Sequence, residues 1–355
     1  MQHRIALIGF GNVNRAFAKL ILEKKDELRN KLGLDLLITC VSDLYQGSVI
    51  NPDGLDLQML CELPIEQGIL GTLDGGKSEA DNFAVISNEA CDLIAEATFT
   101  DSKTGEPALS HLKAALTLGK HFITTNKGPI ALAMPELKSK AHWSKSAMEY
   151  EGVVMSGTPV LRFARENLAG CKIKSFRGIL NGTSNYILGQ VEQGIAMQDA
   201  IKKAQELGYA EADPTADIEG HDVLMKVIIL SNELFGEEVT SAVSNNIPMQ
   251  GITGIDETEI QSAPRHQSHW KLVGEGVLGK DGKPELSIKP ICLGDDDPLS
   301  SVSGAVNAIT FDTDLLGPVT IVGPGAGRTE TAFALLSDVI AVDKQLKTRP
   351  TDEVA

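Results

Sequence analysis

The side chains of this chain that are best suited to acid–base chemistry lie between residues 207 and 230. One lysine, Lys226, precedes the apolar run Val227 to Leu230, and it follows five carboxylates that fall within twelve residues: Glu211, Asp213, Asp217, Glu219 and Asp222. The density of acids indicates a site for a small cation. Lys226 lies four residues after Asp222 and would share its helical face. A lysine held against apolar surface and carboxylates can be tuned for proton transfer. The alternative is a solvated acidic turn followed by a core helix.

A second lysine, Lys127, stands in the segment Thr124 to Pro129 directly after an apolar run. This position places it at the carboxyl end of a predicted strand, where ligands of open α/β sheets gather. The alternative is an ordinary surface lysine in a loop.

A glycine turn, Gly9 to Asn14, follows the first apolar run, Arg4 to Phe10. A strand, a tight glycine turn and a helix N-terminus together place backbone N–H groups at a pyrophosphate. The pattern is G-x-G-x-x-N, so we expect looser packing between helix and strand than a third glycine would allow. Asp43 ends the second strand, where a carboxylate would bond a ribose 2′-OH. No arginine lies near it in the sequence to receive a 2′-phosphate, which favours NAD over NADP. The alternative is a plain βα turn.

The segment Ile179 to Leu188 places Asn, Gly, Thr and Ser at a junction between a strand and a helix. Such residues cap a helix and offer backbone donors to a carboxylate. Helix capping alone is the alternative. The segment Ser156 to Pro159 reads as a turn between two domains.

Two predicted domains position these motifs. Strands and helices alternate through about residue 145, which predicts a Rossmann-like, doubly wound parallel α/β domain. It includes a helix over 13–31 and strands over 35–42, 83–86, 93–98 and 121–125. The second domain is predicted as α+β with a mixed sheet, with strands over 172–180, 270–276, 285–292, 305–311 and 319–322. Its helices are expected near 184–193, 197–207 and 220–235. The boundaries predicted are 1–148, completed by a C-terminal segment 323–355 with a helix over 329–342, and 149–322.

The composition limits the classes of function. The formal charge is −16, from 32 basic and 48 acidic residues, which argues against unaided binding to nucleic acid or to anionic membranes. Five cysteines are scattered without a C-x-x-C pair, which fits a reducing compartment and no zinc site. No apolar run approaches the roughly 18 residues of a membrane span. We therefore expect a cytoplasmic protein.

The motifs together resemble one family. In chain order they read GFGNV, TTNK, GTPV, GILNGTSNYIL and LGYAEADPTADIEGHDVLMK. This combination closely resembles homoserine dehydrogenase over nearly the whole chain, from Ile5 to the turn near Gly325. The chain looks like the short form of that family, without a regulatory domain or a fused aspartate kinase.

The resemblance implies a reaction and its residues. The reaction is reversible hydride transfer between L-homoserine and L-aspartate 4-semialdehyde, with NAD or NADP, in threonine, methionine and isoleucine biosynthesis. Lys226 matches the lysine that usually transfers the proton, and Lys127 the second catalytic lysine. The substrate-binding residues predicted in this way are Glu211, Asp217, Asp222, Gly182, Thr183 and Tyr209. The cofactor-binding residues predicted are Gly9, Phe10, Gly11, Asn12, Val13, Asp43, Thr98, Lys127 and Gly325.

The resemblance also implies a structural sodium ion and a homodimer formed through the second domain. The ion would be held by backbone carbonyls of Glu151, Val154, Ser156 and Thr158. This site rests on the resemblance alone, because every residue has a backbone carbonyl and residue types therefore cannot predict it.

The residue types of the acidic stretch fit this chemistry independently of the resemblance. Homoserine carries an ammonium group, for which Glu211 and Asp217 are suited. Oxidation of its hydroxyl releases a proton, so a base must lie within hydrogen-bond reach of that oxygen. Asp222 would orient Lys226, and Lys127 and Lys226 as neighbours would each lower the pKa of the other; the sequence does not say which is the stronger base. Asp213 is left as an acid at a helix start, and Glu219 as a solvated charge.

Two alternatives remain at this point. One is a different amino-acid or semialdehyde oxidoreductase with two domains, although no cysteine here stands in a motif suited to a nucleophile. The other is a non-catalytic NAD-binding sensor, which would be expected to have lost Lys127 or Lys226. Fold alone would not separate these functions.

Overall fold

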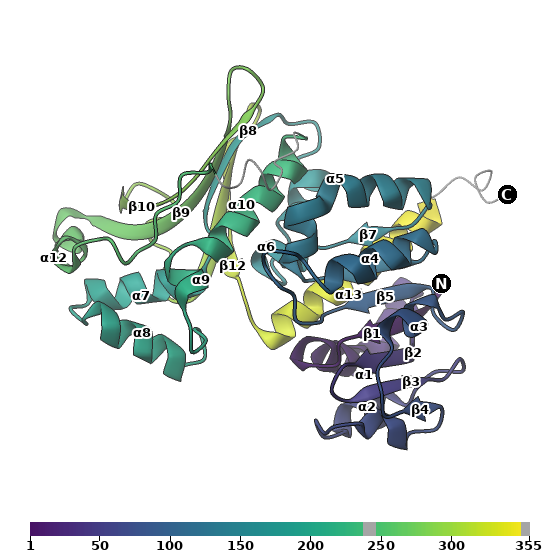
Figure 1. Cartoon of the computed structure of the whole chain (residues 1–355). Coiled ribbons are helices and arrows are strands. Elements are labelled where there is room, and N and C mark those ends of the chain that lie inside the picture. The colour runs from purple at the N-terminus through teal and green to yellow at the C-terminus, as the bar shows by residue number, and fades with distance from the viewer. Residues whose placement is uncertain (237–245, 349–355) are drawn as a thin grey trace. The chain divides into compact units, whose positions relative to one another are not determined.

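The structure is a computed structural model that describes residues 1–236 and 246–348. The chain divides into two compact units (Figure 1). The first unit joins residues 1–153 to the C-terminal segment that starts at residue 327, and the second unit comprises residues 154–326. Residues 349–355 of the predicted C-terminal segment lie outside the described residues. No helix of the described part is long and apolar enough to cross a bilayer.

The first unit is built on one sheet, which in the described residues has seven strands in the order β4-β3-β2-β1-β5-β6-β7. The five neighbouring strands β2-β1-β5-β6-β7 pair in parallel, which confirms the predicted doubly wound sheet. An antiparallel edge of β3 and β4, which was not predicted, extends it. The strands are β1 Gln2–Ile8, β2 Asp35–Asp43, β3 Gly47–Ile50, β4 Gly76–Lys77, β5 Leu93–Glu96, β6 His121–Thr124 and β7 Met148–Glu149.

Helices cover both faces of this sheet (Figure 1). On one face α1 (Asn12–Leu32) packs against α13 (Arg328–Thr348), and on the other α3, α4 and α5 follow one another. The bounds of the remaining helices are α2 Leu57–Glu62, α3 Asn82–Ser87, α4 Ala108–Thr117, α5 Lys127–Trp143 and, at the division between the units, α6 Gly152–Met155; a 3₁₀ turn spans Ile69–Thr72.

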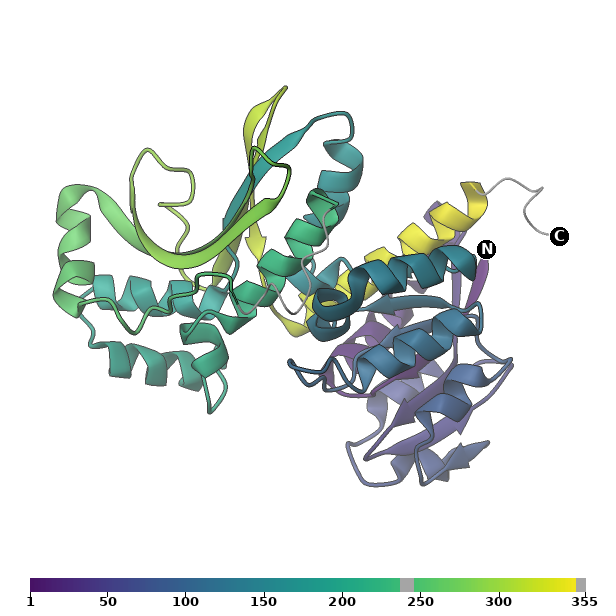
Figure 2. The ribbon, with the colours of Figure 1, turned by 45° about the horizontal axis from the view of Figure 1, so that its top comes forward.

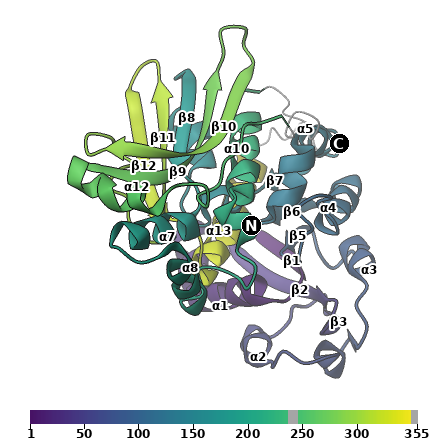
Figure 3. The same ribbon diagram turned by 60° about the vertical axis from the view of Figure 1, so that its left-hand side comes forward.

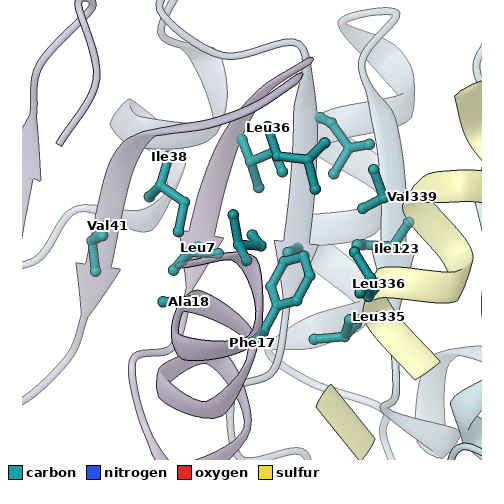
Figure 4. Close-up of a cluster of buried hydrophobic side chains, with 14 of the residues drawn as sticks. Leu7, Phe17, Ala18, Leu36, Ile38, Val41, Ile123, Leu335, Leu336 and Val339 are labelled. Atoms are coloured by element: carbon teal, nitrogen blue, oxygen red, sulfur yellow. The ribbon is translucent and has the colours of Figure 1, made fainter. Parts of the chain in front are cut away.

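The core under α1 explains why the C-terminal helix belongs to the first unit. Phe17 and Leu7 are fully buried, and Leu335 and Val339 of α13 complete the same cluster (Figure 4). Apolar residues of α1 recur at helical spacing on the buried side, and the helix ends at Gly33, whose φ of +61° suits a left-handed cap. The predicted helix over 13–31 is confirmed.

The strand predicted over 83–86 is wrong. These residues form helix α3, which begins after Asp81, whose carboxylate accepts a hydrogen bond from the Ala84 N–H at 2.9 Å. Phe83 is half exposed, so the run is not buried on both faces as a central strand would be. A run of four apolar residues does not distinguish a strand from a short helix, and the capping aspartate decides between them here.

The second unit is built on a sheet that, among its described residues, has five strands in the order β10-β9-β8-β11-β12. The predicted mixed sheet is wrong in this respect, because every pair of neighbouring strands is antiparallel. Short connections join β9 to β10 and β11 to β12, and a tight hairpin connects only antiparallel strands. The strands are β8 Ile173–Ile179, β9 Ser268–Leu278, β10 Pro284–Gly294, β11 Val306–Thr313 and β12 Gly317–Pro324.

Helices α7 and α10 pack on this sheet, and α8 packs on α7 (Figures 2 and 3). The three helices predicted here are confirmed as α7 Gly182–Glu192, α8 Met197–Glu206 and α10 His221–Leu234. Sequence reasoning missed the short α9 Thr215–Ile218 and α12 Glu257–Ser262, a π-helical turn Phe163–Asn167 and a 3₁₀ turn Ala263–His266.

A buried aspartate ties α13 to the first strand. Asp343 Oδ1 lies 3.1 Å from Nε2 of the buried His3, and its Oδ2 lies 2.6 Å from Nζ of Lys347. Burial by itself raises the pKa of Asp343, but hydrogen bonds from Lys347 and His3 outweigh it, so the pKa is lowered from its usual value. A carboxyl with a lowered folded pKa stabilises the fold above its unfolded pKa, and this stabilisation is lost as the pH falls through the folded pKa.

We expect Asp343→Asn to reduce the free energy of unfolding by about 1–2 kcal/mol at pH 7. The difference from the unmodified protein should narrow as the pH falls below about 4, where the carboxyl of the unfolded chain takes up its proton. Urea unfolding across this pH range measures both quantities. Asp53→Asn, at an exposed position of the same unit, is the control. A deficit that stays constant with pH would show that the charge of Asp343 is not the stabilising feature.

Candidate active site

The glycine turn between β1 and α1 has the form that a pyrophosphate requires. Gly9 has φ +79°, and a Cβ there would lie 2.8 Å from the Ala97 carbonyl oxygen, so only glycine fits. A Cβ on Gly11 would meet nothing within 4 Å, which leaves open space in front of the helix. Helix α1 has no side-chain cap and no acid in its first turn, so its N–H groups and positive dipole end suit an anion.

Asn14 occupies the position of the missing third glycine, and its side chain bonds to the strands beneath the helix. Its side chain is fully buried, and Nδ2 lies within hydrogen-bond distance of three carbonyl oxygens: Ile8 at 3.2 Å, Gly9 at 2.7 Å and Ala95 at 3.2 Å. The amide therefore ties helix α1 to the ends of β1 and β5.

We expect alanine substitutions at the two glycines to separate stability from cofactor binding. Gly9→Ala should lower the free energy of unfolding by at least about 1–2 kcal/mol, because it adds left-handed strain and a backbone clash. Gly11→Ala should change stability by no more than about 1 kcal/mol as an N-cap change, yet weaken NADH binding. Urea unfolding and a fluorescence titration with NADH measure the two effects. Equal NADH affinity in Gly11→Ala would argue against the cofactor position.

Asp43 organises the loop beside the glycine turn. Its Oδ2 accepts from the Phe10 N–H at 2.8 Å, and its Oδ1 accepts from the N–H groups of Tyr45 and Gln46 at 3.0 Å each. The carboxylate thus joins the end of β2 to the turn that follows β1. Its role toward a ribose remains a prediction.

An arginine does lie near Asp43, contrary to the sequence-based expectation. Arg15 belongs to α1, and its Nε donates to the Phe10 carbonyl at 3.1 Å, while its guanidinium lies 4.4 Å from the centre of the Phe10 ring. Burial lowers the pKa of Arg15, and the charge of Asp43 opposes this shift. The residues that flank Asp43 in the sequence do not predict this arginine, because it comes from helix α1.

The remaining cofactor residues predicted in the first unit lie at the carboxyl edge of the sheet. Strand order reverses between β1 and β5, and such a switch point is where open α/β sheets bind ligands. Thr98 follows β5 there, and Lys127 is the half-buried first residue of α5. The donor groups and the open glycine turn fit a dinucleotide.

In the second unit Lys226 is buried on α10, and the predicted pairing with Asp222 is confirmed. Lys226 Nζ lies 2.8 Å from Asp222 Oδ2, one helical turn earlier, and donates to the Leu180 carbonyl oxygen at 2.5 Å. The lysine side chain is 6% exposed, so its position is fixed by these contacts and by the core around its stem.

Asn181 connects this lysine to a second carboxylate. Its Nδ2 donates to Asp217 Oδ1 at 2.6 Å and to Asp222 Oδ2 at 3.0 Å, while its Oδ1 accepts from the Ser184 N–H as the cap of α7. Asp217, Asp222 and Lys226 thus form one polar cluster. Sequence reasoning recognised Asn181 only as a cap, although an asparagine inside a strand-to-helix motif was the available signal.

Asn307 was also missed, and no local pattern marks it. It is buried on β11, and its Nδ2 donates to the Leu180 carbonyl oxygen at 2.9 Å, the same oxygen that accepts from Lys226. A Cβ on Gly325 would lie 2.1 Å from the Asn307 side chain, so this glycine gives Asn307 its space. The cofactor role predicted for Gly325 remains a prediction.

The other predicted substrate residues surround the start of α7. Thr183 Oγ1 donates to the Tyr209 carbonyl at 2.7 Å, and a Cβ on Gly182 would lie 2.7 Å from the Ala305 carbonyl oxygen. Glu211 has an exposed side chain, and its carbonyl accepts from Gln205 Nε2 at 3.0 Å. The contacts therefore hold the backbone of Tyr209 against α7 and that of Glu211 against α8.

The two remaining acids have structural contacts. Asp213 accepts from the N–H and hydroxyl of Thr215 at the start of α9, as expected of a helix-start acid, and these bonds lower the pKa of Asp213. Glu219 is not simply a solvated charge, because its Oε1 accepts from the Thr253 hydroxyl at 2.7 Å.

The four residues predicted to hold sodium follow one another along a buried stretch. Glu151, Val154 and Thr158 are buried, and Ser156 has φ +50°, a left-handed conformation that is uncommon outside glycine. Thr158 Oγ1 donates to the Pro324 carbonyl at 2.9 Å. Within residues 1–236 and 246–348 no cluster of three acidic, histidine or cysteine side chains suits a metal ion, so a cation here would depend on carbonyls.

Comparison with known proteins places these features in one family. A family model described as homoserine dehydrogenase matches residues 159–340. An NAD(+)-dependent homoserine dehydrogenase of Pseudomonas canavaninivorans is 51% identical over 341 residues, which are 96% of this chain and 96% of that relative. A homoserine dehydrogenase of Methanocaldococcus jannaschii is 36% identical over 344 residues, 97% of this chain and 99% of that relative.

Solved structures show the same likeness over both units. A hyperthermophilic archaeal homoserine dehydrogenase in complex with NADPH has a TM-score of 0.81 and 28% identity, and the match covers 97% of this chain and 98% of that one. A homoserine dehydrogenase of Thiobacillus denitrificans has a TM-score of 0.84 and 28% identity, covering 100% of this chain and 76% of that one. With its glycine turn, its buried lysine cluster and these relatives, the chain belongs to the homoserine dehydrogenase family.

Proposed function

We propose that this NAD(P)-dependent oxidoreductase interconverts L-homoserine and L-aspartate 4-semialdehyde with Lys226 as its acid and base. Bound NAD(P) supplies the hydride acceptor in one direction and the hydride donor in the other. In oxidation the hydroxyl of homoserine loses its proton to the Lys226 amine while the carbinol carbon loses hydride. In reduction the Lys226 ammonium returns the proton to the aldehyde oxygen.

The observation that carries this proposal is the contact set of Lys226. Asp222 and the Leu180 carbonyl fix Nζ in one place, which a group that acts on one substrate oxygen requires. Lys127 belongs to the first unit and Lys226 to the second, and we propose Lys127 as the second cation near the reacting group.

The same cluster supplies charges for the substrate ammonium. We propose that Asp217 binds this group and that Glu211 contributes from the neighbouring segment. Asn181 holds Asp217 in place by donating a hydrogen bond to its Oδ1. Gly182 and Thr183 at the start of α7 are proposed to receive the substrate carboxylate, because a helix N-terminus favours an anion. Tyr209, whose carbonyl accepts from Thr183, is proposed to contribute from the neighbouring segment.

The first unit favours NAD+ over NADP+. The guanidinium of Arg15 already donates to the Phe10 carbonyl, to the Leu63 carbonyl at 2.6 Å and to the Gln46 side chain, so its donors are engaged within the chain. The Asp43 carboxylate beside it would repel a 2′-phosphate. A relative 51% identical is named as NAD(+)-dependent, whereas a more distant solved relative binds NADPH.

The test is the absorbance at 340 nm of purified protein with L-homoserine and either NAD+ or NADP+ at alkaline pH. We expect the absorbance at 340 nm to rise only when both the substrate and a cofactor are present. The kcat/KM should be at least about tenfold higher for NAD+ than for NADP+, the effect of one unfavourable contact between Asp43 and the 2′-phosphate. Folded protein without signal from either cofactor would contradict the function. Equal use of both cofactors would contradict only the role of Asp43.

We also propose the sodium site and the dimer. A left-handed Ser156 in a buried turn is backbone held against its preference, and a cation bound by the carbonyls of Glu151, Val154, Ser156 and Thr158 would stabilise it. A higher melting temperature in NaCl than in choline chloride is the expected result, and equal melting temperatures would contradict the sodium site.

For the proposed homodimer, light scattering should give twice the mass of one chain, and the mass of a single chain would contradict it. Five free cysteines fit a reducing cytoplasm.

A further inference from the structure

Glu96 is a buried carboxylate at the point of the sheet where the cofactor is proposed to bind. It is the last residue of β5, and it pairs with Ile8 of β1 on one side and with Thr124 of β6 on the other. Its exposed fraction is 0%. It therefore lies directly under the carboxyl edge at which the strand order reverses.

Four donors, from the end of β6 and from the loops after β5 and β6, converge on this carboxylate. Oε1 accepts from the Thr98 N–H at 3.1 Å and from the Thr98 hydroxyl. Oε2 accepts from Asn126 Nδ2 at 2.6 Å and from the Thr124 hydroxyl at 3.3 Å. Asn126 Nδ2 also donates to the Thr98 carbonyl at 2.9 Å, so the loops after β5 and β6 are joined to each other as well as to Glu96.

A buried histidine lies behind the carboxylate and connects it to the end of β2. His111 Nδ1 is 3.6 Å from Glu96 Oε1, and His111 Nε2 is 3.2 Å from Asn82 Nδ2. Asn82 Oδ1 accepts from the Ser42 hydroxyl at 2.7 Å. Both Glu96 and His111 are fully buried, so solvent does not replace these contacts. Hydrogen bonds thus join Ser42, the residue before Asp43, through Asn82 to His111, whose Nδ1 lies beside Glu96 at a distance longer than a hydrogen bond.

We propose that Glu96 is a positioning residue for hydride transfer, which holds Thr98 and Asn126 in the arrangement that the nicotinamide half of the cofactor requires. The proposal rests on the proposed placement of the cofactor at the glycine turn. Ala97, next to Glu96, packs against Gly9 of that turn, and its N–H donates to the Ile8 carbonyl at 2.9 Å. Asn126 directly precedes Lys127 at the start of α5, so the same carboxylate also fixes where that helix begins.

Glutamine has the size of glutamate but cannot satisfy this arrangement. Each oxygen of Glu96 faces an N–H donor, Thr98 on one side and Asn126 on the other. The amide NH2 of a glutamine would face one of these donors in either orientation, and that hydrogen bond would be lost. Glu96→Asp keeps the charge but is one methylene shorter, so it should retain the contact to one loop only.

The test compares Glu96→Gln with Glu89→Gln, the same change at an exposed position of the same unit. We expect Glu96→Gln to raise the KM for NAD+ and the Kd for NADH about tenfold, as loss of one charge-assisted hydrogen bond would produce, and to lower kcat. The KM for homoserine should stay within about twofold, since Glu96 acts on the cofactor side only. Glu96→Asp should lie between Glu96→Gln and the unmodified enzyme, and Glu89→Gln should equal the latter.

A purely structural role gives a different pattern. It would lower the melting temperature and the active fraction of Glu96→Gln while leaving the KM for NAD+ and the Kd for NADH unchanged, and this result would overturn the proposal. If Glu96→Gln does not fold, Asn126→Ala decides, because it removes one donor to Glu96 from the loop side at a residue with no proposed contact to the cofactor. A raised KM for NAD+ in this variant supports the proposal, and a normal value overturns it. An unmodified enzyme that binds NADH but does not oxidise homoserine would instead contradict the proposed function.

Discussion

Replacing Lys226 with alanine is expected to lower kcat for homoserine oxidation by about a thousandfold, the range that one positioned acid–base group supplies. Nζ of Lys226 is held by Asp222 and the Leu180 carbonyl, and the substitution removes the group proposed to take the hydroxyl proton. The Kd for NADH should not change, since the glycine turn proposed to bind the cofactor belongs to the other unit. Stopped-assay turnover and an NADH fluorescence titration measure the two quantities.

Two variants separate lost chemistry from lost stability. Lys226→Met keeps the buried aliphatic stem, so it should fold better than alanine while remaining equally inactive. Lys271→Ala removes a comparable lysine of the same unit, which is 3% exposed and donates to the Val302 carbonyl at 2.6 Å and to Asn185. Burial lowers the pKa of Lys271, and this residue has no proposed role in the reaction. We expect Lys271→Ala to lose stability without a comparable loss of kcat. Similar kcat losses in both alanine variants would show that only burial is being disturbed.

The second large effect is expected from Asp217→Asn. This change keeps the shape of the side chain but removes the negative charge proposed to bind the substrate ammonium. We expect the KM for L-homoserine to rise about tenfold to a hundredfold, the range of one hydrogen bond to a charged group. The KM for NAD+ should stay unchanged. Initial rates with each substrate varied in turn give both constants.

Asp213→Asn is the matched control for this variant. Asp213 belongs to the same acidic stretch, but its carboxylate is exposed and bonds only to Thr215 in the contacts shown by the structure. It should leave the KM for homoserine unchanged. A raised KM in both variants would mean that the stretch acts through its total charge, and a normal KM in Asp217→Asn would remove the assigned role.

Spacing along one helix allowed the buried lysine–aspartate pair to be predicted, because residues four apart meet on the same helical face. Asp222 and Lys226 are such a pair. The rest of the cluster depends on contacts between distant segments. Lys226 and Asn307 both donate to the Leu180 carbonyl oxygen, although the three residues lie far apart in the sequence. Residue types could not predict this contact, because every residue has a backbone carbonyl.

The glycine turn proposed for the cofactor was predictable in outline for a similar reason. A strand, two glycines and a helix are adjacent in the chain, so their order reveals the turn. Arg15 and Asn14 show the limit, because their partners lie at the ends of other strands and in other loops. Phe83 illustrates a different limit, since a short apolar run carries too few residues to define its period.

The central claim is that Lys226 exchanges a proton with the hydroxyl of homoserine. The most direct measurement is the turnover of purified Lys226→Ala enzyme with homoserine and NAD+, with and without added methylamine. The account predicts almost no turnover without amine and a rate that rises with amine concentration, because the small amine replaces the missing base. Turnover equal to that of the unmodified enzyme in the absence of amine would contradict it.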